Sequence, residues 1–263
     1  MNFAPDEVER YARHLLLREV GGPGQQRLRA ARVLLVGAGG LGAPAALYLA
    51  AAGVGTLRIV DPDAVSLSNL QRQVIYDTAD VGAPKPQRAA ARLRALNPHV
   101  EVETVTAAFD EASGPALLEG CDLVLDGTDD FGVRFAVNAA AMAAGVPLVS
   151  GALGRWTGQV GVFAGRPCYC CLVPEAPPDA ETCAAVGVVG ALAGVVGSLM
   201  ALEAVKLLAG AGEPLLGRLW IHDGLAAEGR TVRVAADPEC PVCGPAGGGS
   251  GDGGGLETAA PPA

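Results

Sequence analysis

Residues 32–42, RVLLVGAGGLG, join a short apolar run to a glycine-rich turn. Arg32–Val36 is predicted to be a buried strand and residues 41–52 an apolar helix, so the glycines fall at a strand-to-helix turn. Backbone amides at the start of such a helix bind phosphate. A tight turn in an ordinary α/β protein would show the same pattern. Four glycines are candidate nucleotide contacts: Gly37, Gly39, Gly40 and Gly42.

A second predicted strand, Thr56–Val60, ends directly before Asp61. In dinucleotide-binding folds an acidic residue at this place accepts hydrogen bonds from ribose hydroxyls. Strand, glycine turn, helix and acid together favour an adenine nucleotide over a simple turn, without yet naming the reaction.

Two adjacent acids, Asp129 and Asp130, follow a third predicted strand over residues 122–126 and precede a helix that begins near Phe131. Ligands of open α/β sheets bind at the carboxyl ends of strands, where these side chains fall. The pair is suited to Mg²⁺, which takes carboxylate, water and phosphate oxygens. An aspartate here can equally cap the helix, and the two acids can divide these roles.

The composition limits the class of protein. The chain has 263 residues, half of them hydrophobic, and a net charge of −9. That length predicts one domain, or a domain with a lobe, and the charge argues against general nucleic-acid binding. Only 18% of residues are charged, which suggests that a partner subunit covers apolar surface. The charged N-terminus lacks the apolar segment of a secretory signal, so we expect a cytoplasmic protein with reduced thiols.

Two CxxC pairs form the strongest metal signal. Cys168 and Cys171 belong to one pair, and Cys240 and Cys243 to the other. Four thiolates without histidine make a closed tetrahedral site, which is typical of structural rather than catalytic zinc. Such a site would tie the C-terminal end to the middle of the chain. Disulfides or a redox motif are the alternatives, and a cytosolic location disfavours disulfides.

The other three cysteines have weaker assignments. Cys121 opens an apolar strand and is expected in the core, whereas Cys170 lies between two metal ligands as a bystander. Cys183 follows a proline-rich loop over residues 174–179, where a thiol is either an inert loop residue or a covalent catalyst.

Residues 184–202 contain no charged side chain and are rich in Gly, Ala and Val. Their length would allow a membrane span, and Gly190 and Gly194 have GxxxG spacing. A single crossing would separate the two cysteine pairs, because one pair precedes the segment and the other follows it. We therefore expect a buried helix and no membrane.

The order of elements predicts an α/β fold. Strands near residues 32, 56, 100, 122 and 147 alternate with helices, which gives a Rossmann-like, mostly parallel sheet with helices on both faces. Beyond about Gly158 the runs QVGVFAG, RLWIHD and TVRVAAD follow without alternating helices, so we expect an antiparallel extension.

Several motifs together resemble the MoeB/ThiF/HesA family, bacterial relatives of ubiquitin-activating enzymes, and the cysteine quartet and length are most similar to its MoeB-type members. The resemblance covers residues 9–244, and SNLQRQ with split cysteine pairs is not typical of dehydrogenases. The motifs are RYARHLLLREVG, GAGGLG, DPDAVSLSNLQRQ, VGAPKPQ, LDGTDD with Arg134 and Asn138, VSGALGRWTGQ and the two CxxC pairs.

The resemblance implies an adenylyltransferase with ATP, Mg²⁺ and Zn²⁺. Its substrate would be the C-terminal Gly-Gly of a small ubiquitin-like sulfur carrier of the molybdopterin-synthase type. The terminal carboxylate attacks the α-phosphate of ATP, which gives an acyl-adenylate and pyrophosphate. The alternatives are a thiamine-pathway carrier, activation of a tRNA carboxylate, an NAD-dependent oxidoreductase, and a non-catalytic adaptor for a ubiquitin-like protein.

Residue roles carried over from the family are expectations. Gly40 matches a glycine that faces the nucleotide, Asp61 the ribose ligand and Asp129 the magnesium ligand. Arg13 matches an arginine inserted into the neighbouring subunit's site, which implies a homodimer with composite sites. The remaining nucleotide ligands implied are Ser68, Asn69, Leu70, Gln71, Arg72, Lys85 and Asp130, with Arg13, Arg72, Lys85 and Asp129 catalytic.

The chain departs from the family at a few places. Asp130 stands where Asn is usual and Gly127 where Cys is common. No sulfurtransferase domain follows, so we expect a separate sulfur donor. We expect one adenylation domain over residues 1–244, with nucleotide binding in about 30–155 and carrier docking and zinc in about 156–244. Residues 245–263 are glycine-rich and expected to be disordered.

Overall fold

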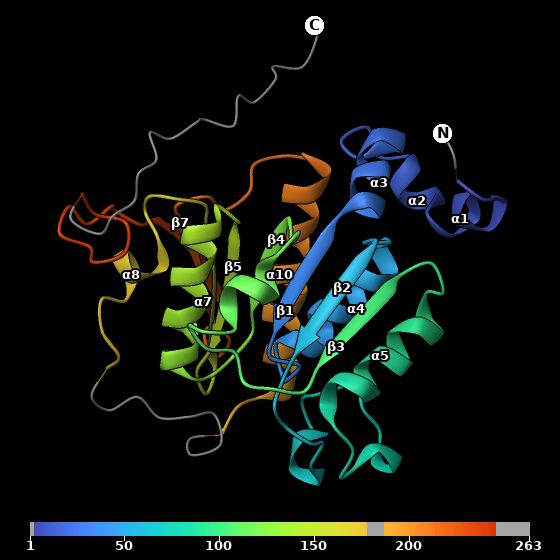
Figure 1. Cartoon of the computed structure of the whole chain (residues 1–263), viewed down its shortest axis with the longest axis horizontal. Coiled ribbons are helices and arrows are strands. Elements are labelled where there is room, and N and C mark those ends of the chain that lie inside the picture. The colour runs from blue at the N-terminus through green and yellow to red at the C-terminus, as the bar shows by residue number, and fades with distance from the viewer. Residues whose placement is uncertain (1–2, 178–186, 246–263) are drawn as a thin grey trace, which may run out of the picture.

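The apolar runs form one eight-stranded sheet in the computed structural model, which describes residues 3–177 and 187–245 (Figure 1). Cys183 and residues 246–263 therefore lie outside the described residues. The strands are β1 (Arg32–Val36), β2 (Thr56–Val60), β3 (Glu101–Val105), β4 (Leu123–Asp126), β5 (Leu148–Leu153), β6 (Thr157–Phe163), β7 (Arg218–Asp223) and β8 (Glu228–Arg233). The helices are α1 (Pro5–Arg10), α2 (Ala12–Leu15), α3 (Gly21–Ala30), α4 (Gly42–Ala52), η1 (Leu67–Asn69), η2 (Thr78–Asp80), α5 (Lys85–Leu96), α6 (Gly114–Leu118), α7 (Phe131–Ala144), α8 (Tyr169–Leu172) and α10 (Gly190–Ala209).

The sheet has the order β3-β2-β1-β4-β5-β6-β7-β8. Pairs from β3 to β5 are parallel, and pairs from β5 to β8 are antiparallel. This confirms the predicted change of pattern near Gly158, since β6 begins at Thr157. The last strand begins and ends earlier than predicted from TVRVAAD, because a tight hairpin pairs Asp223 with Glu228.

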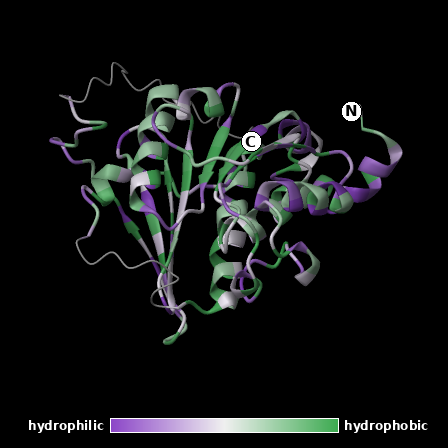
Figure 2. Cartoon of the chain, turned by 60° about the horizontal axis from the view of Figure 1, so that its bottom comes forward, coloured by the Kyte–Doolittle hydropathy of each residue, from purple (hydrophilic) through white to green (hydrophobic). Residues whose placement is uncertain are grey.

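Helices cover both faces of the sheet and bury two apolar cores. Helices α4, α5 and α10 pack on one face, over Leu35, Leu57 and Ile59. Helices α6 and α7 cover the other face, over Val36 and Val124. Figure 2 shows the central strands in hydrophobic colours, whereas the helices near the N-terminus are largely hydrophilic. The parallel strands are apolar on both sides because both sides are covered.

Helix α10 contains residues 190–202 of the uncharged segment and continues to Ala209. By length and composition it is the one helix of the described residues that could cross a membrane. It packs instead against α4, β5 and β6 within the protein. A side chain on Gly197 would begin 2.4 Å from the Leu41 carbonyl oxygen, and one on Gly190 2.2 Å from that of Gln71. Gly194, in contrast, faces open space, so only one glycine of the predicted GxxxG pair makes a close contact within the chain.

Gly197→Ala is expected to lower the free energy of unfolding by about 1–3 kcal/mol, because the added methyl group meets backbone that cannot yield. Gly194→Ala is the matched control on the same helix. It is expected to leave stability unchanged or raise it by about 0.5–1 kcal/mol, since alanine is the better helix former. Thermal unfolding of both variants measures the difference, and equal melting temperatures would contradict this account of the packing.

Candidate active site and metal centre

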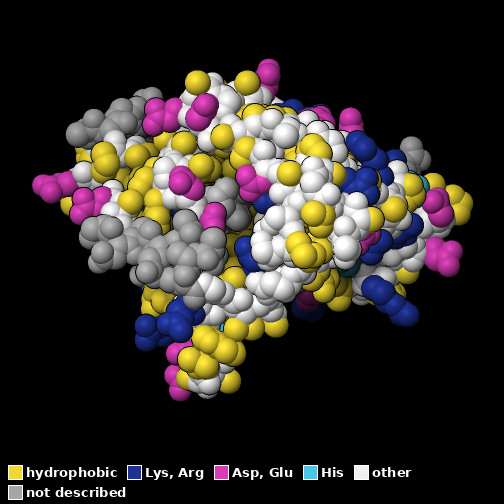
Figure 3. Space-filling view, turned by 90° about the horizontal axis from the view of Figure 1, so that it is seen from below, with side chains coloured by type: hydrophobic (Ala, Val, Ile, Leu, Met, Phe, Trp, Pro, Cys, Tyr) yellow, Lys and Arg dark blue, Asp and Glu magenta, His cyan; other side chains and the backbone are white. Residues whose placement is uncertain are grey.

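A cavity of about 870 Å³ lies at the carboxyl ends of β1, β2 and β4. Figure 3 looks onto this edge of the molecule, where both basic and acidic side chains lie. The edge is where open α/β sheets bind their ligands. The predicted site residues that line the cavity are Gly37, Gly39, Gly40, Asp61, Asn69, Arg72, Lys85, Asp129 and Asp130.

The glycine turn depends on the close approach of Gly42 to the carbonyl oxygen of Gly37. A side chain on Gly42 would begin 1.9 Å from the carbonyl oxygen of Gly37, and Gly37 itself has φ of +87°. Neither position accepts another residue without moving the turn. Gly42 does not line the cavity in the described part of the chain, so its role is to let α4 start directly behind the turn.

Asp61 holds this turn from the neighbouring strand. Its Oδ2 accepts a hydrogen bond from the Ala38 backbone N–H at 2.8 Å, and its Oδ1 accepts one from the Asp63 N–H at 2.8 Å. The Tyr76 hydroxyl donates to the Ala38 carbonyl at 2.9 Å. Burial raises the pKa of Asp61, and the charge of Lys85 partly opposes that rise. Asp61 therefore braces the turn as well as facing the cavity.

Lys85 is a buried cation on the cavity wall, with 4% of its surface exposed. Its Nζ lies 2.7 Å from Asp63 Oδ2 and 3.8 Å from Asp61 Oδ1. The Asp63 carboxylate is mostly exposed, whereas that of Asp61 is buried. A buried ammonium at the end of a groove is a natural partner for a phosphate oxygen.

Arg72 lies beside Gly40 on the cavity wall. Its Cδ is 3.5 Å from the position of a side chain on Gly40, and its Nη1 donates to the Ser68 carbonyl at 3.1 Å. Asn69 accepts from the Ser66 backbone N–H at 3.2 Å, which orders this loop. Among the described residues, Ser68, Leu70 and Gln71 belong to the same loop without lining the cavity.

The two adjacent acids have different environments. Asp130 Oδ1 accepts from the Val133 N–H at 2.8 Å, so it caps α7 as the capping alternative predicted. Asp129 is exposed on the cavity wall, and its carboxylate makes no hydrogen bond with the described residues. Arg134, buried beneath them, donates to the Thr128 carbonyl and lies 3.8 Å from Asp126. The loop that carries Asp129 is thus held from below, and Asp129 is left open for a cation.

Arg13 lies apart from this cavity. It is exposed on α2 and is not among the residues that line the cavity of its own chain.

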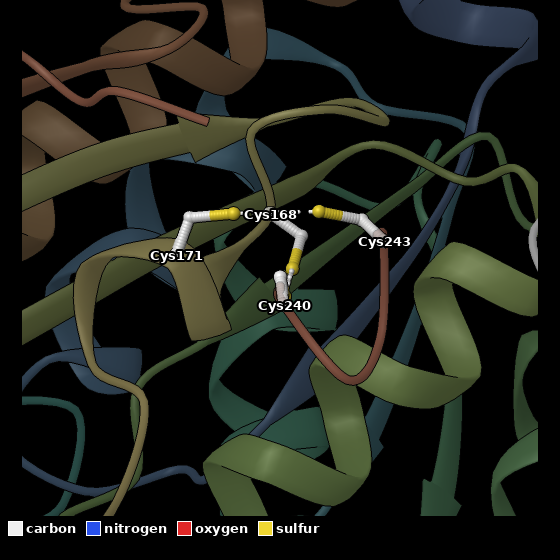
Figure 4. A group of neighbouring side chains, drawn as sticks. All are labelled: Cys168, Cys171, Cys240 and Cys243. Carbon is white, nitrogen blue, oxygen red and sulfur yellow. Dashed lines mark hydrogen bonds between the residues drawn. The ribbon is translucent and has the colours of Figure 1, made fainter. Parts of the chain in front are cut away.

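The four predicted cysteine ligands meet in one cluster (Figure 4). Their sulfur atoms all lie within 4.8 Å of one another. Cys168 Sγ is 3.6 Å from Cys240 Sγ, and Cys171 Sγ is 3.3 Å from Cys243 Sγ. These distances are too long for disulfides and close to the roughly 3.8 Å between ligands of a tetrahedral ion with bonds of about 2.3 Å.

The donor chemistry of the cluster fits a bound cation. The neighbouring Cys170 thiol lowers the pKa of Cys168 to about 4 by hydrogen bonding. Burial raises the pKa of Cys240 and Cys243. Four thiolates side by side need a positive ion, so the donor set suits Zn²⁺. Cys170 is not one of the four and accepts from Asn138 Nδ2 at 3.4 Å, which agrees with a bystander role.

The comparisons with known proteins decide the family. The family model described as "ThiF family" matches residues 11–242. The chain belongs to the ThiF family. This ThiF-family protein is 47% identical over 253 residues to the sulfur carrier protein adenylyltransferase of Thermus thermophilus, with 93% of each chain covered. It is also 47% identical over 245 residues to the molybdopterin-synthase adenylyltransferase of Escherichia coli, which covers 92% of this chain and 98% of that one.

Solved structures agree on the fold of this ThiF-family protein. A crystal structure of Escherichia coli MccB with MccA-N7isoASN superposes with a TM-score of 0.79 at 21% identity and covers 92% of this chain and 76% of that chain. The fold is therefore shared with a solved structure.

Several residues around the cavity were not predicted from the sequence. Asp63, Tyr76 and Asp126 hold the turn and the loop. Asp63 and Asp126 lie within the motifs DPDAVSLSNLQRQ and LDGTDD, whereas nothing in the spacing of Tyr76 distinguishes it from an ordinary loop residue. Gln73 and Arg134 carried a signal, because both lie in motifs that the family resemblance singled out. Both line the cavity and are buried.

Lys85→Met is expected to destabilise the fold by roughly 3 kcal/mol near neutral pH, because it leaves the buried Asp61 carboxylate without a cation. The loss of Lys85 raises the pKa of Asp61 further. A raised carboxyl pKa in the folded state weakens stability above that pKa and not below it. The deficit relative to the wild type should therefore shrink as the pH falls through the raised pKa of Asp61.

Urea unfolding of the wild type and Lys85→Met at several pH values measures this dependence. The double variant Asp61→Asn, Lys85→Met removes both charges and should recover much of the lost stability. A deficit that stays constant from neutral to acidic pH would show that the Lys85 side chain stabilises the fold through packing alone.

The cysteine cluster is expected to hold one zinc ion per chain. Removal of zinc with a chelator should lower the melting temperature by roughly 10 °C, since structural zinc contributes several kcal/mol to folding. Elemental analysis of Cys240→Ser should show loss of zinc, whereas Cys121→Ser, outside the cluster, should retain it. Purified wild-type protein without zinc and without response to the chelator would refute the site.

Proposed function

We propose that this chain adenylates the C-terminal glycine of a small ubiquitin-like sulfur carrier, at the expense of ATP. One observation carries the proposal: the cavity joins a phosphate-binding turn, a ribose-facing acid, two cations and an open acid at one sheet edge. The names of the relatives, which are sulfur carrier and molybdopterin-synthase adenylyltransferases, support the same reaction.

The reaction needs charge neutralisation more than covalent chemistry. The carrier's carboxylate oxygen forms a bond to the α-phosphorus while the bond to the bridging oxygen breaks, which gives acyl-AMP and pyrophosphate. Two anions must approach each other, so positive groups around the phosphates lower the barrier. Arg72, Lys85 and the amides of the glycine turn supply them, with Asp61 towards the ribose.

Asp129 is the proposed ligand for Mg²⁺, because its carboxylate is open to the cavity and makes no hydrogen bond with the described residues. An ion held there would supply positive charge that neutralises the phosphates. Asp130 in place of the usual Asn adds negative charge here, although its Oδ1 is engaged in capping α7.

A homodimer with composite sites is part of the proposal. Tyr48 and Leu202 are large exposed apolar side chains, and both line an apolar groove of about 360 Å³ between α4 and α10. His14 of α2 borders the same groove, which brings the neighbouring Arg13 to this face. A second copy on this face would cover the groove and place Arg13 within reach of the partner's nucleotide.

The zinc cluster has a structural role in this proposal. Residues from about 156 to 244 form the carrier-docking part, next to the nucleotide-binding part of about 30–155.

We expect a molybdopterin-synthase-type carrier, with the thiamine-pathway carrier as the alternative, and a separate sulfur donor. Cys183 lies outside the described residues, and its covalent role stays a hypothesis. The expected location is the cytoplasm.

ATP–pyrophosphate exchange with Mg²⁺ tests the reaction. The purified protein is incubated with a molybdopterin-type carrier, a thiamine-type carrier, or no carrier. Exchange that requires one carrier's intact Gly-Gly end establishes adenylation and identifies the pathway. A zinc-loaded protein without exchange for either carrier would overturn the proposal.

Arg13→Ala and Asp129→Ala should each reduce exchange at least 100-fold while leaving the melting temperature unchanged, because both side chains are exposed. Composite sites make a further result distinctive. Unfolding and refolding a one-to-one mixture of the two inactive variants should restore about a quarter of wild-type activity. Half of the dimers formed are mixed, and each mixed dimer has one intact site out of two. No recovery in the mixture would place Arg13 and Asp129 in the same subunit's site.

A further inference from the structure

Gln73 is a buried side chain of the cavity wall that no motif role explains. Only 4% of its surface is exposed, and it lines the cavity directly after Arg72. Its Oε1 is buried and has no hydrogen-bond partner among the described residues. Buried polar atoms are nearly always paired, because leaving one unpaired is costly. The amide of Gln73 therefore lacks a partner that a ligand or an ordered water would supply.

The position of this amide points to the phosphates. The Gln73 backbone is fixed, since its N–H donates to the Asn69 carbonyl at 2.9 Å and its own carbonyl accepts from the Tyr76 N–H at 3.2 Å. The Nε2 atom lies 3.6 Å from where a side chain on Gly39 would begin. The amide thus borders the face of the glycine turn on which a nucleotide phosphate would rest.

Only one other buried side-chain atom of the described residues lacks a hydrogen-bond partner, and it lines the same cavity. This atom is Nη1 of Arg134. The charge of Arg134 is nevertheless balanced, because Nη1 lies 3.8 Å from Asp126 Oδ2. The other terminal nitrogen, Nη2, donates to the Thr128 carbonyl. No charged or hydrogen-bonding neighbour among the described residues accounts in this way for Oε1 of Gln73. Both unpaired atoms lie where a polar ligand would be bound, and Gln73 is the one that needs it.

We propose that Gln73 is a nucleotide ligand: its Nε2 donates a hydrogen bond to a phosphate oxygen of bound ATP, and its Oε1 accepts one from a water molecule that hydrates the phosphates. The inference rests on the proposed use of ATP. A neutral amide at this place adds a donor to the phosphates without adding to the positive charge of Arg72 and Lys85. The unpaired Oε1 is an acceptor, so the water that hydrates the phosphates, and not the phosphate itself, would supply its hydrogen bond.

Calorimetric binding of ATP, AMP and adenosine to the full chain, without a carrier, tests the proposal. Gln73→Leu keeps the approximate size of the side chain and removes both polar atoms. It should weaken ATP binding roughly 10- to 100-fold, as expected for the loss of a hydrogen bond to a charged group, and leave adenosine binding unchanged. Gln73→Glu should weaken ATP binding further, because its carboxylate repels the phosphates.

A structural role predicts different results. If Gln73 merely shaped the wall, Gln73→Leu would weaken adenosine and ATP equally or lower the melting temperature. The ligand role predicts a melting temperature equal to or above that of the wild type, since the variant removes an unpaired buried polar group. Gln87→Leu, at an exposed glutamine that does not line the cavity, is the matched control and should bind ATP as the wild type does.

The outcomes separate this inference from the proposed reaction. Unchanged ATP affinity in both Gln73 variants, in a protein whose wild type exchanges pyrophosphate, overturns the ligand role and leaves the reaction intact. Conversely, absence of exchange with every carrier overturns the reaction, while a selective loss of ATP affinity in Gln73→Leu would still establish the ligand. If Gln73→Leu does not fold, Gln73→Glu, which keeps the size and one acceptor, decides between these outcomes.

Discussion

The contact between Gly42 and the Gly37 carbonyl oxygen is the constraint on which the site depends. Because a side chain on Gly42 would begin 1.9 Å from that oxygen, α4 can start directly behind β1 only with glycine there. The chain then turns sharply, and Gly37, Gly39 and Gly40 line the cavity. Asp61 accepts a hydrogen bond from the Ala38 N–H and Tyr76 donates one to the Ala38 carbonyl, so both backbone groups of one residue in the turn are held.

The second half of the chain supports this turn through α10. Gly197 lies against the Leu41 carbonyl at the start of α4, and Gly190 lies against the Gln71 carbonyl in the loop that carries Arg72. A long apolar helix with larger residues at these points would push both segments outward. The absence of charge that suggested a membrane span is thus explained by packing. Helix α10 lies between the loop that carries Arg72 and strands β5 and β6.

The sequence predicted the elements whose signals are local. The glycine turn, the alternation of strands and helices and the spacing of the cysteines are short patterns with direct physical causes, and the structure confirms them. The sequence alone could not show which loop residues contact one another across the sheet. The pairing of Lys85 with Asp63 joins positions 22 residues apart, and the bond from Tyr76 to Ala38 spans 38. Such contacts follow from the tertiary arrangement and leave no period in the sequence.

Helix α8 connects the cysteine cluster to the cavity, because Tyr169 lines the cavity and Cys171 belongs to the cluster. Asn138 of α7 accepts from the Tyr169 backbone N–H at 2.9 Å and donates to Cys170, so α7 and the cysteine-bearing α8 are joined directly. Tyr169 lines the cavity beside Arg134, which in turn holds the Thr128 carbonyl next to Asp129. A zinc ion that fixes Cys168 would therefore also fix the backbone from which Tyr169 faces the cavity. A metal held there would need no contact with substrate to influence the site. The loop that carries Asp129 is supported by α7, and α7 is joined to the residues that flank the cysteine cluster.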